Sequence, residues 1–353
     1  MTGSNQFHLD SSEAETAPIG WDEQLHALDG PVFHSIAWSR FSTAQQRALR
    51  PVFFRLVDAD AAVFGQALGF VQRAKFGLGN VLTLEALPTV RDGDRSTLLA
   101  FLDEIEQYGL RQRIDCVSFG SYGALPGTET LWRPSDSRTE RFEFLFDLQG
   151  ETEAEQFSRF PSNRRNKIRQ AERRGVTVRE QSDAEGVRLL WRVQADSVQR
   201  IKQRGGPDLT GVRRSDATSD PYQILLEAGV ARLYAVLSGE EPLSAGFYTF
   251  FAGRVYNTLA GHSREGLRAD SGTVLNWHVM CQSRAAGFRE FNLGGCGGDA
   301  VDESSPEHGV YSYKKRLGAE VRTCVGASRI LRPCAFRLKS AIRQLAGRSS
   351  LQA

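Results

Sequence analysis

A lysine-containing segment near the end of the chain has residue types that could bind or stabilise a negative charge. Residues 309–318 read Gly-Val-Tyr-Ser-Tyr-Lys-Lys-Arg-Leu-Gly and follow an acidic loop. Upstream, residues 293–299 (Leu-Gly-Gly-Cys-Gly-Gly-Asp) are predicted to form a glycine-rich loop directly after a strand, where the backbone can approach a ligand closely. A lysine beside such a loop can stabilise a developing oxyanion or a phosphate. The alternative is a solvated helix end with ordinary lysines. The loop matches neither the Walker pattern nor the dinucleotide fingerprint.

A second candidate is the strongly basic stretch that runs from Pro161 to Gly175. It contains one acid and six basic residues, namely Arg164, Arg165, Lys167, Arg169, Arg173 and Arg174. Proline in the first turn and glycine after the last turn are typical of helix ends. The stretch therefore predicts either a solvated surface helix or a helix that docks and steers an anionic polymer or nucleotide.

Metal chemistry is not indicated by the histidines and cysteines. The six histidines have no close spacing to one another or to cysteine, so no metal site is predicted. Cys296 with His308 could form a nucleophile–base pair, but the sequence shows no orienting third residue, and an incidental thiol is the preferred interpretation.

Composition limits the class of protein. The 353 residues include 44 basic and 42 acidic ones, for a net charge of +2, so anion binding must come from local patches. Five scattered cysteines fit reduced thiols in a cytoplasm better than a disulfide framework. Residues 1–18 are polar and acidic, and we interpret them as a loose tail. No apolar run is long enough for a membrane span. The basic amphipathic segment 333–347 could contact an anionic membrane peripherally, although packing on its own domain is preferred.

The elements that must position these residues alternate between helices and strands, which predicts a mixed α/β protein. Helices are expected at 21–45 (with a break near residues 30–31), 96–108, 163–174, 187–201, 221–228 and 271–286, and strands at 51–57, 62–71, 80–87, 114–119, 141–148, 176–178, 229–237, 242–251, 254–261 and 290–293. The second half repeats the order of the first: helices, a meander of strands, a helix and a strand. Two related units are therefore predicted.

Three segments together resemble the Fem family, whose members transfer amino acids to peptidoglycan precursors, and its wider acetyltransferase-like (GNAT) relatives. They are the basic helix 163–176, the stretch from Arg254-Val-Tyr-Asn257 to residues 287–295, and residues 309–318. The resemblance covers roughly residues 158–318. It implies two tandem GNAT-like domains with mixed central sheets, the second carrying the transfer site, and attack of an amine on an activated ester or thioester.

The resemblance also implies roles for individual residues. Lys314 would stabilise the tetrahedral oxyanion or the leaving group, and Tyr256 would lie in the acceptor cleft. Arg204 would bind an acceptor phosphate or carboxylate, with Asn257 and Tyr313 as further substrate-binding candidates. The basic helix would steer tRNA through a set of cations that comprises Arg164, Arg165, Lys167, Arg169 and Arg173. Asp299 is the candidate general base.

The chain also departs from the family, because it has no long charged heptad arm of the kind that some members use to contact tRNA. The segment 264–272 lacks closely spaced glycines and has Asp270 where a diphosphate would bind, which favours aminoacyl-tRNA over acyl-CoA as co-substrate. We therefore expect a cytoplasmic enzyme, favoured as a monomer and without a bound cofactor. It would transfer an aminoacyl group to a free amine of a small peptide or nucleotide-linked acceptor. The alternatives are an acyl-CoA-dependent N-acyltransferase and a non-catalytic RNA-binding protein.

The expected domain limits are 1–18 for the tail, 19–145 for the first domain, 146–328 for the second, and 329–353 for a C-terminal helix that packs on the first domain.

Overall fold

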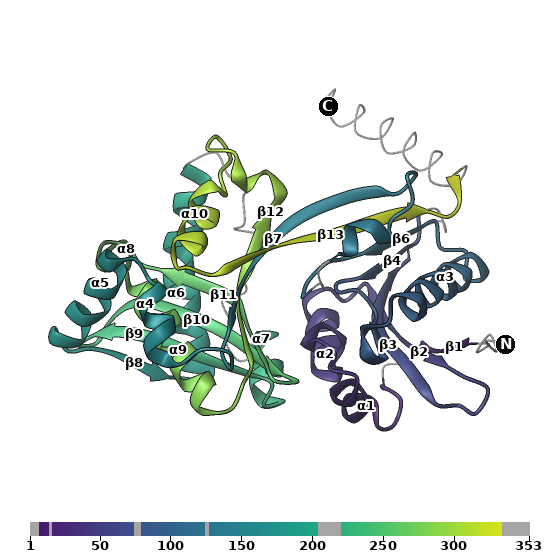
Figure 1. The fold of residues 1–353 in the computed structure, drawn as a ribbon, viewed down its shortest axis with the longest axis horizontal. Coiled ribbons are helices and arrows are strands. Elements are labelled where there is room, and N and C mark those ends of the chain that lie inside the picture. The colour runs from purple at the N-terminus through teal and green to yellow at the C-terminus, as the bar shows by residue number, and fades with distance from the viewer. Residues whose placement is uncertain (1–6, 14–15, 74–78, 124–126, 204–219, 334–353) are drawn as a thin grey trace. The chain divides into compact units, whose positions relative to one another are not determined.

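The computed structural model describes residues 7–13, 16–73, 79–123, 127–203 and 220–333. The chain divides into two compact units. Unit 1 consists of Met1–Glu140 and Cys324–Ala353, and unit 2 consists of Arg141–Thr323. Strands β7 (Ser137–Asp147) and β13 (Glu320–Ile330) contain the two boundaries (Figure 1).

Unit 1 contains a mixed sheet with helices on both faces. Its elements are β1 (His8–Ser12), α1 (Trp21–Ala27), η1 (Val32–His34), α2 (Ile36–Gln45), β2 (Leu49–Val57), β3 (Val63–Gln72), β4 (Val81–Leu84), β5 (Thr89–Val90), η3 (Arg91–Gly93), α3 (Arg95–Arg111), β6 (Cys116–Phe119) and η4 (Thr128–Leu131). The adjacent β2 residues Phe53 and Phe54 point to opposite faces, where Phe53 contacts Trp21 of α1 and Phe54 contacts Tyr108 of α3.

Unit 2 repeats this plan with longer strands. Its elements are α4 (Glu153–Arg159), α5 (Ser162–Arg173), β8 (Val176–Glu180), α6 (Ala184–Gln203), α7 (Tyr222–Glu227), β9 (Ala231–Ser238), β10 (Glu241–Phe251), β11 (Arg254–His262), α8 (Arg264–Ala269), α9 (Ser271–Ala285), β12 (Glu290–Gly297), η6 (Gly298–Val301) and α10 (His308–Arg316). Phe247 of β10 packs on Tyr222 of α7, whereas its neighbour Tyr248 bonds to Asn276 of α9, so helices again cover both faces.

The strand order confirms the predicted repeat. In unit 1 the order is β1-β2-β3-β4-β6-β13, and in unit 2 it is β7-β12-β11-β10-β9-β8. Each sheet has one parallel pair among antiparallel neighbours: β4 with β6, joined through α3, and β11 with β12, joined through α9. The expected α/β fold class, with two related units and mixed strand pairing, is thereby confirmed.

The structure corrects the sequence-based interpretation at both ends of the chain. Residues 8–12, expected in a loose tail, form β1 because their backbone pairs with β2 from His8–Val57 to Ser12–Phe53. Near the other end, residues expected to begin a terminal helix belong to β13, which continues to Ile330. The helix expected over the remaining C-terminal residues lies mostly outside the described residues.

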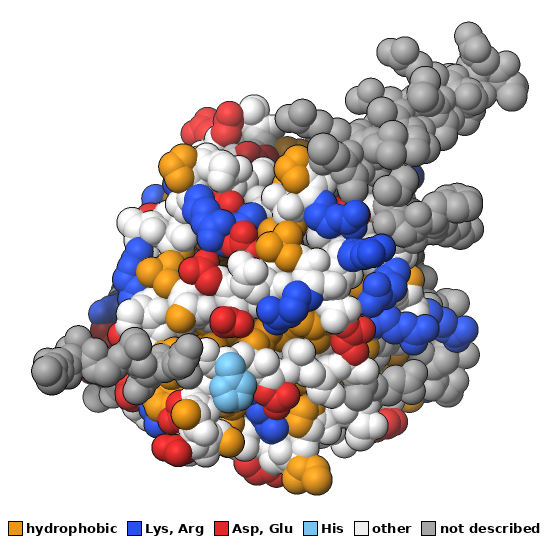
Figure 2. All heavy atoms as spheres, turned by 90° about the vertical axis from the view of Figure 1, so that its right-hand side faces the viewer, with side chains coloured by type: hydrophobic (Ala, Val, Ile, Leu, Met, Phe, Trp, Pro, Cys, Tyr) orange, Lys and Arg blue, Asp and Glu red, His pale blue; other side chains and the backbone are white. Residues whose placement is uncertain are grey.

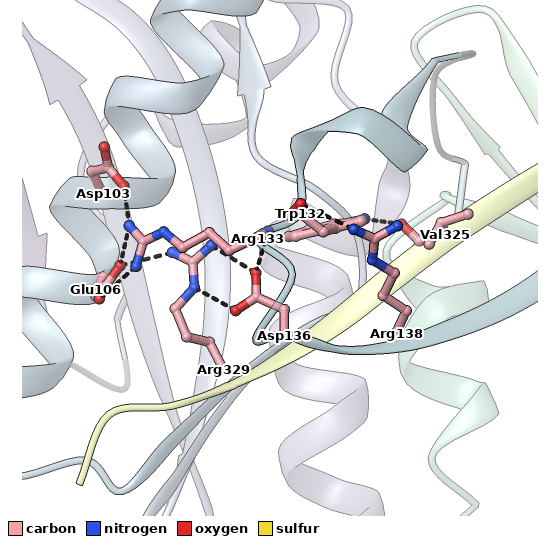
Figure 3. A network of polar contacts seen from close by, with 8 residues as sticks. All are labelled: Asp103, Glu106, Trp132, Arg133, Asp136, Arg138, Val325 and Arg329. Carbon is pink, nitrogen blue, oxygen red and sulfur yellow. Dashed lines mark hydrogen bonds and ion pairs between the residues drawn. The ribbon is translucent and has the colours of Figure 1, made fainter. Parts of the chain in front are cut away.

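The end of β13 completes unit 1. Ala327–Ile330 pair with β6, and the buried Arg329 donates through Nε and Nη2 to the two oxygens of Asp136 at 3.1 and 3.0 Å (Figure 3). Its Nη1 reaches Glu106 of α3 at 2.7 Å. Burial alone would raise the pKa of Asp136, but the hydrogen bonds from Arg329 and the Arg133 backbone hold that pKa below its usual value.

Positive and negative side chains are interspersed on the face drawn in Figure 2, as the small net charge leads one to expect. Within the described ranges, no helix has the length and apolar character needed to cross a bilayer.

Candidate active site

The candidate site lies where the parallel strands β11 and β12 stop pairing. They pair only from Arg254–Glu290 to Tyr256–Asn292. Beyond that point β11 contains an extra residue, Thr258, because Asn257 pairs with Tyr248 while Leu259 pairs with Phe247. β-Bulges of this kind redirect side chains and are frequent beside active sites. The side chains of residues 256–260 are only half-buried in this otherwise buried sheet.

The expected glycine-rich loop is instead part of β12, which continues to Gly297. After an irregularity between Asn292 and Gly295, the strand pairs with β7 through residues 295–297. Gly294 has φ +73°, and a Cβ there would lie 2.7 Å from the Asn257 carbonyl oxygen and 3.5 Å from Lys314 Nζ. Glycine is therefore required for the close approach of β11 and the lysine.

Lys314 is the central cation of the site. Its Nζ donates to the Gly295 carbonyl oxygen at 3.1 Å and lies 5.8 Å from the centre of the Phe144 ring. Burial lowers the pKa of Lys314 to about 8, with a further lowering by Arg141. Among the described residues Gly295 supplies its one hydrogen-bond acceptor, so two ammonium donors remain for a ligand.

A buried carboxylate, Glu143 of β7, lies beside this lysine in a hydrogen-bonded network. Glu143 Oε1 accepts from Arg141 Nη1 at 2.6 Å and from the Tyr256 hydroxyl at 3.0 Å. Glu143 Oε2 accepts from Asn292 Nδ2 at 2.8 Å, and Asn292 Oδ1 accepts from the Gly294 backbone N–H at 2.8 Å. The network connects the tyrosine of β11 to the irregular part of β12.

A second network connects β11 to the two helices that flank the site. Asn276 Oδ1 of α9 accepts from Asn257 Nδ2 at 3.1 Å and from the Tyr248 hydroxyl at 3.0 Å. Asn276 Nδ2 donates to the Gly272 carbonyl oxygen at 2.9 Å and lies 3.4 Å from the hydroxyl of Tyr313 in α10. Burial raises the pKa of Tyr313 to about 12, so this phenol stays protonated at neutral pH.

Four of the residues predicted from the sequence thus lie in one contiguous region: Lys314, Tyr256, Asn257 and Tyr313. Asp299, the candidate base, is exposed in η6, and its Oδ2 accepts from Ser305 Oγ at 3.0 Å. Within the described ranges, no hydrogen bond joins Asp299 to this region. Arg204 lies outside the described residues.

The basic helix forms as predicted, as α5, with Ile168 and Ala171 buried and Gly175 at φ +69° after its end. Two of its arginines are engaged within unit 2. Arg164 pairs with Asp270 at 2.5 Å, and Arg165 Nη1 donates to the carbonyl oxygens of Ser158 and Phe160.

Among the remaining cations, Arg169, Arg173 and the C-cap residue Arg174 are exposed, and Lys167 is half-buried. Arg169 is exposed and stacks over the Phe157 ring at 5.3 Å. Lys167, Arg173 and Arg174 have no ion pair among the described residues, and both arginines are exposed. These four residues form what we call the open cationic face of α5.

Cys296 and His308 do not form a nucleophile–base pair in the structure. His308 Nδ1 lies 3.1 Å from the Ala300 carbonyl oxygen and its Nε2 lies 2.9 Å from Ser312 Oγ, so the hydrogen bonds of this histidine do not involve Cys296. Burial raises the pKa of Cys296 to about 11, which keeps the thiol protonated. Within the described ranges no cluster of His, Cys, Asp or Glu could hold a metal ion.

Sequence reasoning missed Glu143, Asn292 and Asn276. In the strand 141–148 the alternating phenylalanines drew attention to one face, whereas Arg141 and Glu143 occupy the other face. The available signal was an Arg-x-Glu pair placed between the alternating phenylalanines. The two asparagines had no signal of their own, because their partners come from distant parts of the chain.

Comparison with known proteins places this site in a known type of domain. Residues 158–315 match the profile of the acetyltransferase (GNAT) domain. The structure is similar to the crystal structure of FemX, with a TM-score of 0.72 and 15% sequence identity over 93% of this chain and 99% of that one. It is also similar to L-PGS from Bacillus licheniformis, with a TM-score of 0.55 and 16% identity over 94% and 99% of the two chains.

A conserved protein of unknown function from Bacteroides thetaiotaomicron has a TM-score of 0.54 and 11% identity over 91% and 100% of the two chains. No curated protein matches this sequence. At these identities the likeness to solved structures shows the fold, and the predicted resemblance to the Fem family is confirmed at that level. Residues 158–315 thus form an acyltransferase domain of the GNAT type.

Proposed function

We propose that this GNAT-type acyltransferase transfers an aminoacyl group from aminoacyl-tRNA to a free amine of a peptidoglycan precursor or peptide-like metabolite, forming an amide bond. The observation that carries the proposal is the position of Lys314. Its half-buried ammonium, anchored on Gly295, has two donors available at the point where β11 and β12 diverge. A charge fixed in a partly desolvated site stabilises a developing oxyanion more strongly than water does.

The chemistry requires little beyond orientation and charge stabilisation, because the donor is already an activated ester. The acceptor amine attacks the ester carbonyl, and the carbonyl oxygen becomes an oxyanion that Lys314 stabilises. Tyr256, Asn257 and Tyr313 would bind the two substrates around this point, which supplies the proximity that accelerates a bimolecular step. Because all these residues belong to unit 2 of one chain, a monomer suffices for the reaction.

The open cationic face of α5 supports an anionic donor. Lys167, Arg169, Arg173 and Arg174 lie along a short helix whose other arginines, Arg164 and Arg165, hold it in place. Such a face would attract and orient the phosphodiester backbone of tRNA. Aminoacyl-tRNA is made in the cytoplasm, where we place the reaction.

An acyl-CoA donor is the second candidate. The observation in its support is the match of residues 158–315 to an acetyltransferase domain. Asp270 argues against this donor. Its carboxylate lies at the N-terminus of α9, where the diphosphate of CoA would otherwise bind.

The deciding experiment offers the purified chain a mixed pool of charged tRNA or acetyl-CoA, each with a panel of amine acceptors, and identifies amide products by mass spectrometry. Amide formation from one charged tRNA, with retention of that tRNA over its uncharged form, supports the proposal. Transfer from acetyl-CoA alone would assign the second candidate. Salt-dependent RNA binding without transfer from either donor would identify an RNA-binding protein and overturn the proposal.

A further inference from the structure

A serine and a histidine of α10 form a hydrogen-bonded pair that the proposed transfer reaction does not use. Ser312 Oγ lies 2.9 Å from His308 Nε2, within the range expected for a nucleophile and its general base. His308 Nδ1 lies 3.1 Å from the carbonyl oxygen of Ala300 in η6. Among the described residues, neither side chain is hydrogen-bonded to the two networks that surround Lys314. The pair therefore has to be explained separately.

We propose that Ser312 and His308 form a second reactive site, in which Ser312 is a nucleophile that accepts the acyl group of a small activated ester. His308 is the general base that removes the serine proton. Water then hydrolyses the ester formed on Ser312, so the chain has an esterase activity in addition to acyl transfer. This inference does not depend on the proposed aminoacyl transfer or on its donor.

The contact with Ala300 sets the tautomer of His308. A carbonyl oxygen can only accept a hydrogen bond, so the single proton of the neutral imidazole lies on Nδ1. Nε2 then presents its lone pair to Ser312, whose hydroxyl donates. The Ala300 carbonyl thus orients the ring as the carboxylate does in a Ser-His-Asp triad. This is the orienting third group that the sequence did not show for Cys296 and His308.

The positive charge that forms on the ring has a carboxylate near it. Asp302, in the loop between η6 and α10, attracts His308 electrostatically. When Ser312 gives its proton to the ring, an imidazolium forms, and a nearby carboxylate stabilises that charge. Asp302 therefore lowers the free energy of the state in which the proton has left the serine.

The hydroxyl of Ser312 lies on an accessible part of the helix. Both Ser312 and His308 are half-buried, whereas Gly309, one turn before Ser312, is exposed. Apart from the backbone of its own helix, a Cβ at Gly309 would meet no atom within 4 Å. Residues three apart in a helix lie on the same side, so the Gly309 side of Ser312 is open to a small ester.

Arg316 provides a cation on the same side of α10. His308, Ser312 and Arg316 follow one another at intervals of four residues, which makes them neighbours on the helix surface. Arg316 is exposed, and among the described residues no hydrogen bond or ion pair engages its guanidinium. Its N–H groups can therefore turn to the oxyanion that forms when Ser312 attacks a carbonyl. Base, nucleophile and oxyanion donor thus come from a single helix.

The reaction balances in atoms and charge. A bond forms between Ser312 Oγ and the carbonyl carbon, and the hydroxyl proton moves to His308 Nε2. The carbon–oxygen bond to the leaving alcohol breaks, and the alcohol oxygen takes that proton. Water then attacks the acyl group, and its proton moves through His308 to Ser312 Oγ as the bond between Oγ and the acyl carbon breaks. The net reaction consumes one ester and one water and releases one acid and one alcohol.

Two probes test the full chain. A fluorophosphonate forms a stable ester with an activated serine and releases fluoride, and the hydrolysis of p-nitrophenyl acetate is followed by absorbance. The variants are Ser312→Ala, His308→Gln and Arg316→Met. The matched control is Ser158→Ala, because Ser158 is also a helical serine but its Oγ donates to the Glu155 carbonyl oxygen instead of a histidine. Peptide mass spectrometry identifies the labelled residue.

We expect a single phosphonate adduct on each wild-type chain, at Ser312, and none on Ser312→Ala. His308→Gln should be labelled and should hydrolyse the ester roughly 100-fold more slowly, at the low end of what general base catalysis contributes. Arg316→Met should lower kcat for hydrolysis by about tenfold, less than the loss of a fixed oxyanion donor, because this side chain is exposed. Ser158→Ala should behave as the wild type in both assays.

The outcomes decide between a reactive pair and an ordinary hydrogen bond on a helix. A wild-type chain that takes no phosphonate, or takes it at another residue, overturns the proposal. The same holds if Ser312→Ala hydrolyses the ester at the wild-type rate, or if His308→Gln is labelled as fast as the wild type. A wild-type kcat for Arg316→Met would remove its assignment as the oxyanion donor. Because labelling of the wild type is itself decisive, the test does not require every variant to fold, and it is independent of amide formation.

Discussion

The ammonium of Lys314 is the charge on which the proposed reaction depends, and its surroundings make that charge sensitive to pH. Burial lowers the pKa of Lys314 to about 8, so the cation is present below that pH and is lost as the pH rises through it. Glu143 opposes the lowering and Arg141 adds to it. The site therefore contains a lysine whose charge changes within the range of ordinary assays.

Replacing Lys314 by Ala should lower kcat by about 10²–10³-fold, the loss seen when one oxyanion donor is removed. In the wild type, kcat should also fall as the pH rises through about 8, and the variant should lack this limb in its pH–rate profile. The matched control is Lys315→Ala, which removes the exposed neighbouring lysine. A wild-type rate for Lys314→Ala would remove the catalytic assignment.

His34 illustrates a different use of a titratable residue, in the core of unit 1. The Leu68 backbone N–H donates to His34 Nδ1 at 3.0 Å, so Nε2 carries the proton and donates to the Leu87 carbonyl oxygen at 2.8 Å. Both ring nitrogens are used by the neutral form. Burial lowers the pKa of His34 to about 4.

Because the folded-state pKa of His34 is below its unfolded value of about 6.5, its contribution to stability is full above pH 6.5. That contribution should be lost as the pH falls toward about 4, and it amounts to roughly 3 kcal/mol. The measurement is the free energy of unfolding by urea at pH 7 and pH 4.5 for the wild type, His34→Gln and the exposed control His8→Gln. His34→Gln should be less stable at pH 7 and show a smaller pH dependence, and an unchanged pH dependence would contradict the argument.

At the scale of elements, the open cationic face of α5 should contribute to donor binding and little to folding. Replacing Lys167, Arg173 and Arg174 together by Ala should raise KM for charged tRNA and leave kcat at saturation nearly unchanged. The slope of log K against log salt should become shallower by up to about one unit for each phosphate that the variant no longer neutralises.

The contrasting α5 variant is Arg164→Ala, which removes the ion pair with Asp270 and should act through the position of the helix. It should lower the melting temperature, whereas the triple variant should not. An unchanged salt slope in the triple variant would argue against α5 as the element that binds tRNA.

The irregular part of β12 is the element that brings Lys314 to β11. Replacing Gly294 by Ala places a Cβ at 2.7 Å from the Asn257 carbonyl oxygen in a residue with φ +73°. The control is Gly239→Ala in the β9–β10 turn, where φ is +60° but no atom lies within 4 Å. Both variants should lose about 1–2 kcal/mol of stability from the left-handed backbone. Only Gly294→Ala should also lose transfer activity, and equal activities in the two variants would contradict the proposed geometry.

How far the sequence predicts such a site depends on where each residue finds its partner. The helices and strands followed from local periodicity, and Lys314, Tyr256, Asn257 and Tyr313 lie in segments with recognisable motifs. By contrast, the glycines of β12 resembled a loop because their pairing partner, β7, is about 150 residues away in the chain. Glu143 was missed for the same reason, because its hydrogen-bond partners Tyr256 and Asn292 come from two other strands. Long-range pairing is what single-sequence patterns do not contain.

At the scale of the whole molecule, the chain leaves unit 1 through β7 and returns to it through β13. Unit 1 is therefore complete only when the last strand pairs with β6. The residues that fix this strand come from three separate segments: Arg329 from β13, Glu106 from α3 and Asp136 from the stretch before β7 (Figure 3). The Trp132 indole N–H adds a bond to the Val325 carbonyl oxygen at 3.0 Å.

Breaking this cluster should destabilise unit 1, because removing one partner leaves an unpaired charge in a buried position. For Arg329→Met we expect a loss of about 3–5 kcal/mol in the free energy of unfolding, the range for a broken buried ion pair. Arg188→Met is the matched control, since it removes an exposed pair with Glu185 that should contribute less than about 1 kcal/mol.

Hydrogen exchange locates the effect: in Arg329→Met the amides of β6 and α3 should lose protection while those of β9 and β10 keep it. Equal loss of protection in both units would mean that they unfold as one cooperative body. Unchanged exchange in β6 would mean that backbone pairing alone holds β13.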